Sequence, residues 1–199
     1  MNEANQNENM NKENANLADR FIILDGKVNE DMSKKVTEKI LKLNINDEKL
    51  RVEKADFTER PVKLILNTVG GSIYEANSIV GTVETSVTPV HTYCYGKTMS
   101  AGFYIFSSGA KRFASPLSSF MYHDASVGMF NTIEGLKNDF EWYEKLRDQM
   151  DEYLLSVTNL PREMMDYKKS RKEDWYLTAR EALQYGLADE LLPFRKRNK

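Results

Sequence analysis

Few side chains in this 199-residue sequence are suited to nucleophilic catalysis, and having only two histidines limits the choice most. His91 lies inside a run typical of a strand, whereas His123 closes the apolar run Phe120–Tyr122, where a strand gives way to polar residues. An imidazole at such a strand end can take a proton from a serine or cysteine nucleophile. His123 is therefore a candidate general base, and the alternative is a packed histidine with one satisfied ring nitrogen.

Ser100 is the candidate nucleophile because it lies in a turn of small residues, Gly96 to Gly102, that leads into a helix. The unpaired N–H groups at a helix start can meet an anion, such as the oxyanion of acyl transfer. The match to the hydrolase motif G-x-S-x-G is incomplete, because Thr98 stands where the first glycine belongs. A serine that only caps the helix is the alternative.

Cys94, Lys97 and the pair Gly70-Gly71 offer further chemistry. Cys94 lies between tyrosines in a strand pattern, where a thiol usually behaves as a small buried hydrophobe. Lys97 could be the base of a serine–lysine dyad, although a solvated side chain explains it equally well. The glycine pair follows an apolar strand and could aim an N–H at a carbonyl oxygen, or could form an ordinary turn.

Composition favours one globular domain without nucleic acid or membrane partners. Apolar residues make up 41% of the chain, charged residues 29%, and the formal net charge is -2, which leaves no surplus to attract a polyanion. A single cysteine excludes an intrachain disulfide, and no signal-like or membrane-spanning apolar segment is visible. We expect a soluble, cytoplasmic protein with a disordered polar tail over 1–19, a domain over 20–192 and a basic tail over 193–199.

The elements that must position these residues alternate between strand and helix. Apolar runs predict strands at 20–24, 62–66, 87–95, 118–123 and 174–177. Helical spacing predicts helices at 30–43, 72–85, 99–109, 132–157, from 161 onward and at 178–185. Residues 25–26 and 67–71 are expected to be turns, and the charged segment 44–60 a surface loop. This alternation predicts a largely parallel sheet with binding groups beyond the carboxyl ends of its strands.

Four blocks in chain order resemble the proteolytic subunit of the Clp protease. They are Leu66–Ser72, Gly96–Gly102, Met121–His123 and Asp174–Asp189, and the likeness spans about Arg20 to Leu192. The resemblance implies an α/β fold, a ClpP/crotonase-like spiral of repeated β-β-α units. A handle helix at about 132–157 would protrude from it.

The resemblance also assigns the site residue by residue. Ser100 aligns with the nucleophile of the family, His123 with its base and Asp174 with its orienting acid. The backbone N–H groups of Gly71 and Ala101 align with its oxyanion donors. The remaining substrate-binding positions would be Gly70, Ser72, Ile73, Ser126 and Val127.

The implied activity is that of an ATP-dependent Clp-type serine endopeptidase subunit, which hydrolyses unfolded polypeptides inside a ring of seven copies or a double ring of fourteen. The resemblance implies no metal and no cofactor, and an AAA+ unfoldase as partner. Docking of that partner is expected to be weak, because Lys63 and Ile65 stand where tyrosines are common in the family. The axial N-terminal segment of the family is also not recognisable in residues 1–19.

Four further positions depart from the family pattern: Val69 replaces a proline, Met99 and Ala101 flank the serine in place of Ala and Met, and Glu173 replaces an arginine. Two alternatives to an active peptidase share the fold. One is a catalytically inactive ring subunit, against which the complete set of Ser100, His123 and Asp174 argues. The other is a crotonase-type acyl-CoA enzyme, which also uses paired N–H groups but does not need the three side chains.

Overall fold

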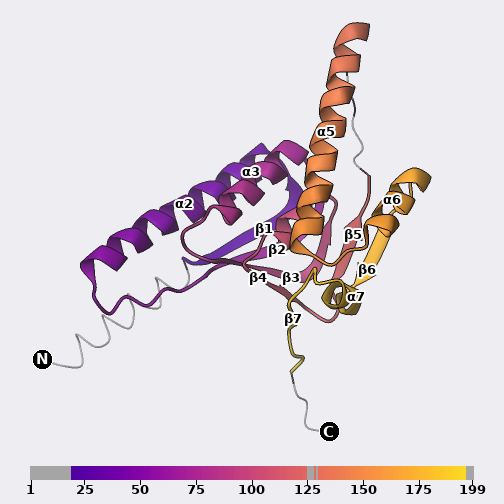
Figure 1. The fold of residues 1–199 in the computed structure, drawn as a ribbon. Coiled ribbons are helices and arrows are strands. Elements are labelled where there is room, and N and C mark those ends of the chain that lie inside the picture. Colours follow the sequence, from indigo (N-terminus) through magenta and orange to yellow (C-terminus); the bar gives the residue numbers. More distant parts are fainter. Residues whose placement is uncertain (1–18, 125–127, 129, 196–199) are drawn as a thin grey trace, which may run out of the picture.

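The computed structural model describes residues 19–124, 128 and 130–195, and its centre is a seven-stranded sheet (Figure 1). The main path runs in the order β1-β2-β3-β4-β7, with β5 beside β3 and β6 beside β5. Every pairing is parallel except that of β5 with β6. The strands are β1 (Phe21–Val28), β2 (Val62–Gly71), β3 (Val90–Met99), β4 (Lys111–Ala114), β5 (Ser119–Tyr122), β6 (Trp175–Thr178) and β7 (Glu190–Leu191). The prediction of an α/β fold with a largely parallel sheet is confirmed.

Helices cover the sheet and bury its apolar side chains. In Figure 1, α2 and α3 lie side by side along one face, α6 and α7 lie near β5 and β6, and α5 rises away from the body. Their bounds are α2 (Glu30–Glu53), α3 (Ile73–Glu84), α4 (Ala101–Ser107), α5 (Ile133–Val157), α6 (Arg162–Arg171) and α7 (Ala179–Gln184). The short α4 is buried along its whole length and packs on β2 and β3. The Ser100 turn is thereby anchored in the core.

The predicted loop over 44–60 is wrong in its first half, because α2 continues to Glu53. The buried side of this extension carries Asn44 and Asp47 in place of apolar residues. Asp47 bonds Arg20 and the Thr88 hydroxyl, while Asn44 accepts from the Thr88 N–H. Since polar contacts hold this half of the helix, its apolar periodicity ends at Leu43.

The turns predicted at 25–26 and 67–71 are also wrong, since both segments belong to longer strands. Gly26 has φ +92°, and a register shift follows it, so a bulge carries β1 onward to Val28. β2 likewise runs to Gly71, which pairs with Val28. Glycine is needed at Gly71, because a Cβ there would come within 2.2 Å of the Val28 carbonyl oxygen.

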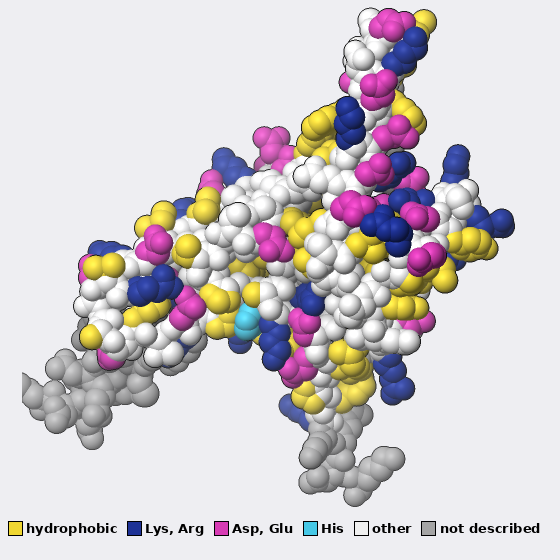
Figure 2. Space-filling view, viewed as in Figure 1, with side chains coloured by type: hydrophobic (Ala, Val, Ile, Leu, Met, Phe, Trp, Pro, Cys, Tyr) yellow, Lys and Arg dark blue, Asp and Glu magenta, His cyan; other side chains and the backbone are white. Residues whose placement is uncertain are grey.

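The helix α5 is covered by the rest of the chain along only part of its length. Leu146, Met150 and Leu154 of its C-terminal half are buried, whereas Phe140 is 56% exposed and Ile133 77% exposed. Figure 2 shows the N-terminal half projecting from the body with hydrophobic side chains among its charged ones. The predicted apolar stripe is therefore divided into a packed half and an uncovered half.

Candidate active site

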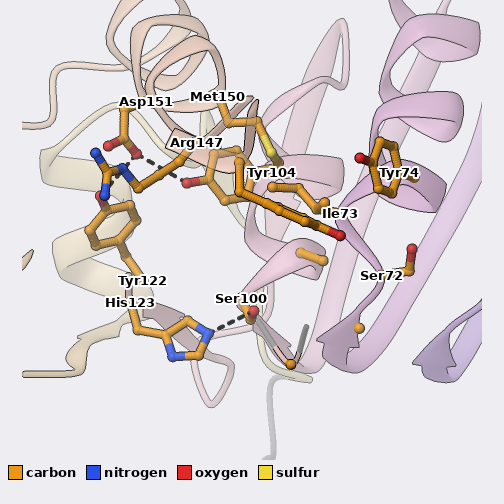
Figure 3. Close-up of a pocket in the computed structure, with 14 residues that line it drawn as sticks. Ser72, Ile73, Tyr74, Ser100, Tyr104, Tyr122, His123, Arg147, Met150 and Asp151 are labelled. Carbon is orange, nitrogen blue, oxygen red and sulfur yellow. Dashed lines mark hydrogen bonds between the residues drawn. The ribbon is translucent and has the colours of Figure 1, made fainter. Parts of the chain in front are cut away.

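The register between β3 and β5 brings the turn of Ser100 beside the end of β5. The two strands run parallel, with Met99 paired to Met121. The Ser100 N–H donates to the Met121 carbonyl oxygen at 2.8 Å, which continues the pairing for one more residue. His123 follows two residues later, and its Nε2 lies 2.8 Å from the Ser100 Oγ (Figure 3).

The register between β5 and β6 brings Asp174 to the other side of the imidazole. These strands are antiparallel, with Tyr122 paired to Trp175, so His123 and Asp174 are the next residues outward on each strand. The Asp174 Oδ1 lies 3.5 Å from the His123 Nδ1, and the Tyr176 hydroxyl donates to its Oδ2 at 3.3 Å. Residues 51 positions apart in the sequence thus flank one ring through strand pairing.

The backbone at Ser100 is strained in a way typical of functional turns. Its φ of 52° and ψ of -126° lie in a region that residues with a Cβ rarely occupy. Such a conformation costs on the order of 1–3 kcal/mol and persists only where the surroundings impose it. Here the buried α4 and the bond to Met121 impose it, and the turn presents the Oγ to His123.

Two glycines at the end of β2 let its backbone approach this turn closely. A Cβ on Gly70 would come within 2.7 Å of both the Met99 carbonyl oxygen and the Ser100 Cβ. Gly71 and Ala101 both line the cavity beside Ser100. The N–H of Ala101, at the first position of α4, has no acceptor within the helix. Residues at the ends of two elements therefore line the cavity beside the Ser100 hydroxyl.

A cavity of about 340 Å³ opens beside Ser100 and His123, between α3, α4, β5 and α5. Of the positions predicted to bind substrate, Ser72 and Ile73 line this cavity and Gly70 does not; Ser72 also caps α3 by accepting from the Glu75 N–H. Ser126 and Val127 lie outside the described residues. The lining residues that the sequence did not indicate are Tyr74, Tyr104, Tyr122, Gly128, Tyr143, Arg147, Met150 and Asp151.

Comparison with known proteins shows which family the chain belongs to. The family model described as Clp protease matches residues 4–195. The chain is also 28% identical over 185 residues to the ATP-dependent Clp protease proteolytic subunit of Deinococcus radiodurans, an alignment that covers 92% of this chain and 85% of the relative. This chain belongs to the Clp protease family. The ClpP fold implied by the four sequence blocks is thereby confirmed. At 28% identity to this relative, the chain is a divergent member of the family.

The polar end of the cavity in this Clp family member is built around Asp151 (Figure 3). Its Oδ1 accepts from the hydroxyls of Tyr122 at 2.9 Å and Tyr104 at 3.1 Å, and its Oδ2 accepts from Lys169 at 2.7 Å. Burial and the Asp151 charge raise the pKa of both tyrosines, so both hydroxyls stay protonated. Burial lowers the pKa of Lys169, but its bonds to Asp151 and Asp166 outweigh burial and raise it. Asp151 thus accepts hydrogen bonds from two hydroxyls and one ammonium.

The other candidate nucleophile and base are placed less favourably. Cys94 is fully buried in β3, and desolvation raises the pKa of its thiol to about 11, so the thiolate is scarce near neutral pH. His91, also in β3, has a pKa lowered by burial and by Lys111 and Lys63. Its ring lies tilted against that of Phe113, and His91 does not line the cavity.

Within the described part of the chain, no cluster of His, Cys, Asp or Glu has the arrangement of a metal site. In the same residues, no helix combines the length and apolar character needed to cross a membrane.

The sequence contained a signal for Asp151 that its charge obscured. Asp151 directly follows Met150 and precedes Leu154 by three positions, so it lies at the edge of the apolar stripe of α5. A carboxylate at such a position must be paired, because leaving it unpaired in a buried site is costly. Tyr104 and Tyr122 lie in otherwise apolar runs, so their hydroxyls are buried donors that could pair with such a carboxylate.

Proposed function

We propose that this chain is the serine endopeptidase subunit of a Clp-type protease, with Ser100 as nucleophile, His123 as general base and Asp174 as the acid that orients the imidazole. The observation that carries the proposal is the 2.8 Å contact between the Ser100 Oγ and the His123 Nε2 at a strained turn that leads into the buried α4. The position of Asp174 on the opposite ring nitrogen supports it. Membership of the Clp protease family supports the reaction class.

In the proposed reaction, the Ser100 Oγ attacks a peptide carbonyl carbon while its proton passes to the His123 Nε2. The resulting oxyanion accepts from the N–H groups of Gly71 and Ala101. The C–N bond then breaks, and the protonated imidazole gives its proton to the leaving amine. A water molecule, deprotonated by His123, hydrolyses the acyl-enzyme and restores the Ser100 hydroxyl.

Asp174 keeps the Nδ1 of His123 protonated and stabilises the imidazolium that forms during attack. Its 3.5 Å separation from the Nδ1 is longer than a hydrogen bond, which spans about 2.7–3.2 Å for N–H to O. Catalytic hydrogen bonds commonly tighten when substrate binds. A shift of a few tenths of an ångström would complete this one.

The substrates we propose are unfolded polypeptides, and the active particle a ring or double ring of this chain. The uncovered half of α5 supports assembly, because Phe140 and Ile133 would otherwise leave an apolar surface in water. Light scattering should give the mass of seven or fourteen subunits. A stable monomer at micromolar concentration would contradict this part of the proposal.

An unfoldase partner should dock weakly. On the open face of the sheet, the Lys63 ammonium lies 5.0 Å from the centre of the Phe21 ring and beside the β3 strand that carries His91. An apolar docking segment there would have to desolvate this charge. We expect cleavage of short peptides but slow degradation of a tagged folded substrate by this protein with ATP and a Clp unfoldase. Degradation at the rate of a conventional Clp subunit would contradict this, whereas stronger binding in Lys63→Tyr would support it.

The direct test of the activity is hydrolysis of fluorogenic peptides by Ser100→Ala, with Cys94→Ala and Lys97→Met as controls. We expect Ser100→Ala to lose cleavage and the two controls to keep it, because neither the buried thiol nor Lys97 has a role in the proposed reaction. Hydrolysis of an acyl-CoA thioester without peptide cleavage would favour the crotonase alternative. Wild-type protein that assembles without any cleavage would favour an inactive ring subunit.

A further inference from the structure

Asp151 contacts three elements, and each of them lies next in the chain to one member of the proposed triad. Tyr104 lies in α4, the helix that begins directly after Ser100. Tyr122 is the last residue of β5 and directly precedes His123. Lys169 lies in α6, whose C-terminal turn leads to Asp174. One carboxylate on the handle helix α5 therefore joins the elements that hold the nucleophile, the base and the acid.

The connection from Lys169 to Asp174 runs through a rigid turn. The Glu173 N–H donates to the Lys168 carbonyl oxygen at 3.0 Å, and the Lys168 ammonium lies 3.0 Å from the Glu173 carboxylate. Lys172 completes this turn in the left-handed conformation, with φ 55°. A displacement of the end of α6 would therefore move Asp174 with it.

We propose that Asp151 is the positioning residue of this active site, which holds Ser100, His123 and Asp174 in register from the handle helix. The inference rests on the proposed peptidase function. Asp151 has the burial that such a role requires, since its side chain is 5% exposed and its hydrogen-bond partners among the described residues are all donors. A buried charge with three partners has few alternative arrangements, because losing any partner leaves polar atoms unsatisfied.

Because Asp151 positions the reacting groups, replacing it should lower the rate of cleavage and leave substrate affinity nearly unchanged. Misplacing reacting groups by about 1 Å can lower a rate on the order of a hundredfold. Tyr104 and Tyr122 hold Ser100 and His123 only through the chain, so removing one hydroxyl loosens one member of the triad. Asp151→Asn keeps an oxygen for the tyrosines but turns an amide toward Lys169, so it releases the element of Asp174.

The experiment measures kcat and KM for a short peptide with Tyr104→Phe, Tyr122→Phe and Asp151→Asn, together with the assembly size and melting temperature of each variant. We expect kcat to fall about tenfold for each tyrosine variant and ten- to a hundredfold for Asp151→Asn, with KM changed less than about threefold. The tyrosine effect should disappear when Tyr122→Phe is added to a variant that lacks the carboxylate, Asp151→Ala, because the two act as a unit.

Glu152→Gln is the matched control, since Glu152 is the next residue on α5 and also bonds α6, through Arg162, but at the surface. It should keep the wild-type kcat. A lower melting temperature with unchanged kcat in the three variants would show a merely structural role, and a raised KM with unchanged kcat would show a substrate contact. Either result overturns the inference. Absence of cleavage by the wild type would instead reject the proposed function, so the two failures are distinguishable. If Asp151→Asn does not fold, the tyrosine variants alone decide.

Discussion

Two buried carboxylates, Asp47 and Asp151, have similar partners at opposite edges of the sheet. Asp47 of α2 pairs with Arg20 and accepts from the Thr88 hydroxyl at 2.8 Å, close to where β1 and β3 begin. Asp151 of α5 pairs with Lys169 and accepts from two tyrosines, close to where β5 ends. Both side chains are at most 5% exposed.

The difference between them follows from the direction of parallel strands. Their carboxyl ends meet at one edge, and loops at that edge carry the chemistry of such sheets. Asp47 lies at the amino edge, where its contacts join α2 to the body of the domain. Asp151 lies at the carboxyl edge, where equivalent contacts reach the residues around the cavity. Identical physical interactions therefore serve stability at one edge and, in our proposal, geometry at the other.

Asp174 extends the comparison to an acid whose loss should affect rate alone. Its side chain is 45% exposed, so Asp174→Asn should leave the melting temperature nearly unchanged. Peptide cleavage should nevertheless fall about 10³- to 10⁴-fold, because an amide no longer favours the productive imidazole tautomer. Steady-state kinetics beside a thermal melt measure both effects. A normally active Asp174→Asn protein would assign the orienting role to another acid.

Asp47→Asn should show the opposite pattern. Breaking a buried ion pair typically destabilises a protein by about 3 to 5 kcal/mol, and in Asp47→Asn the Arg20 guanidinium would keep an amide oxygen but lose its counter-charge. Urea unfolding should detect this loss, while cleavage per folded molecule at low temperature stays at the wild-type level. A large fall in kcat with normal stability would erase the distinction between the two edges.

Replacing Asp189 should have the smallest of these effects, a loss of stability that depends on pH. Burial would raise the pKa of Asp189, but hydrogen bonds from Arg112 at 2.7 to 2.9 Å outweigh it, and the pKa is lowered below 3.8. A lowered folded-state pKa stabilises the protein above 3.8, and this contribution is lost as the pH falls through the folded value.

Because this pair is partly exposed, Asp189→Asn should cost about 1 kcal/mol at neutral pH. The difference from wild type should shrink as the pH falls below 3.8. Urea unfolding at several pH values measures it, and a difference that grows on acidification would contradict the assignment.

Much of the site could be predicted from the sequence because it lies at element ends that have local signals. Ser100 stood out in its small-residue turn and His123 at a strand end. Asp174 had no such signal, since its place beside His123 depends on the register between β5 and β6. Only the resemblance to a known family indicated it.

The errors have two physical causes, which are polar contacts in place of apolar ones and glycine conformations that continue a strand. The second half of α2 was missed because Asn44 and Asp47 occupy its buried side. Asp151 was missed because an acid between Met150 and Leu154 suggests an exposed position. Strand ends were missed where Gly26 and Gly71 stay within β-ladders in conformations that usually mark turns.

The most direct test of the account is the site of covalent labelling by a fluorophosphonate, followed by intact mass and peptide mapping. Ser100 and Ser72 are the serines that line the cavity within the described residues. We predict one label per subunit, on Ser100, with none in Ser100→Ala and strongly slowed labelling in Asp174→Asn. A label on Ser72, or one that persists in Ser100→Ala, would contradict the assignment of Ser100 as the nucleophile.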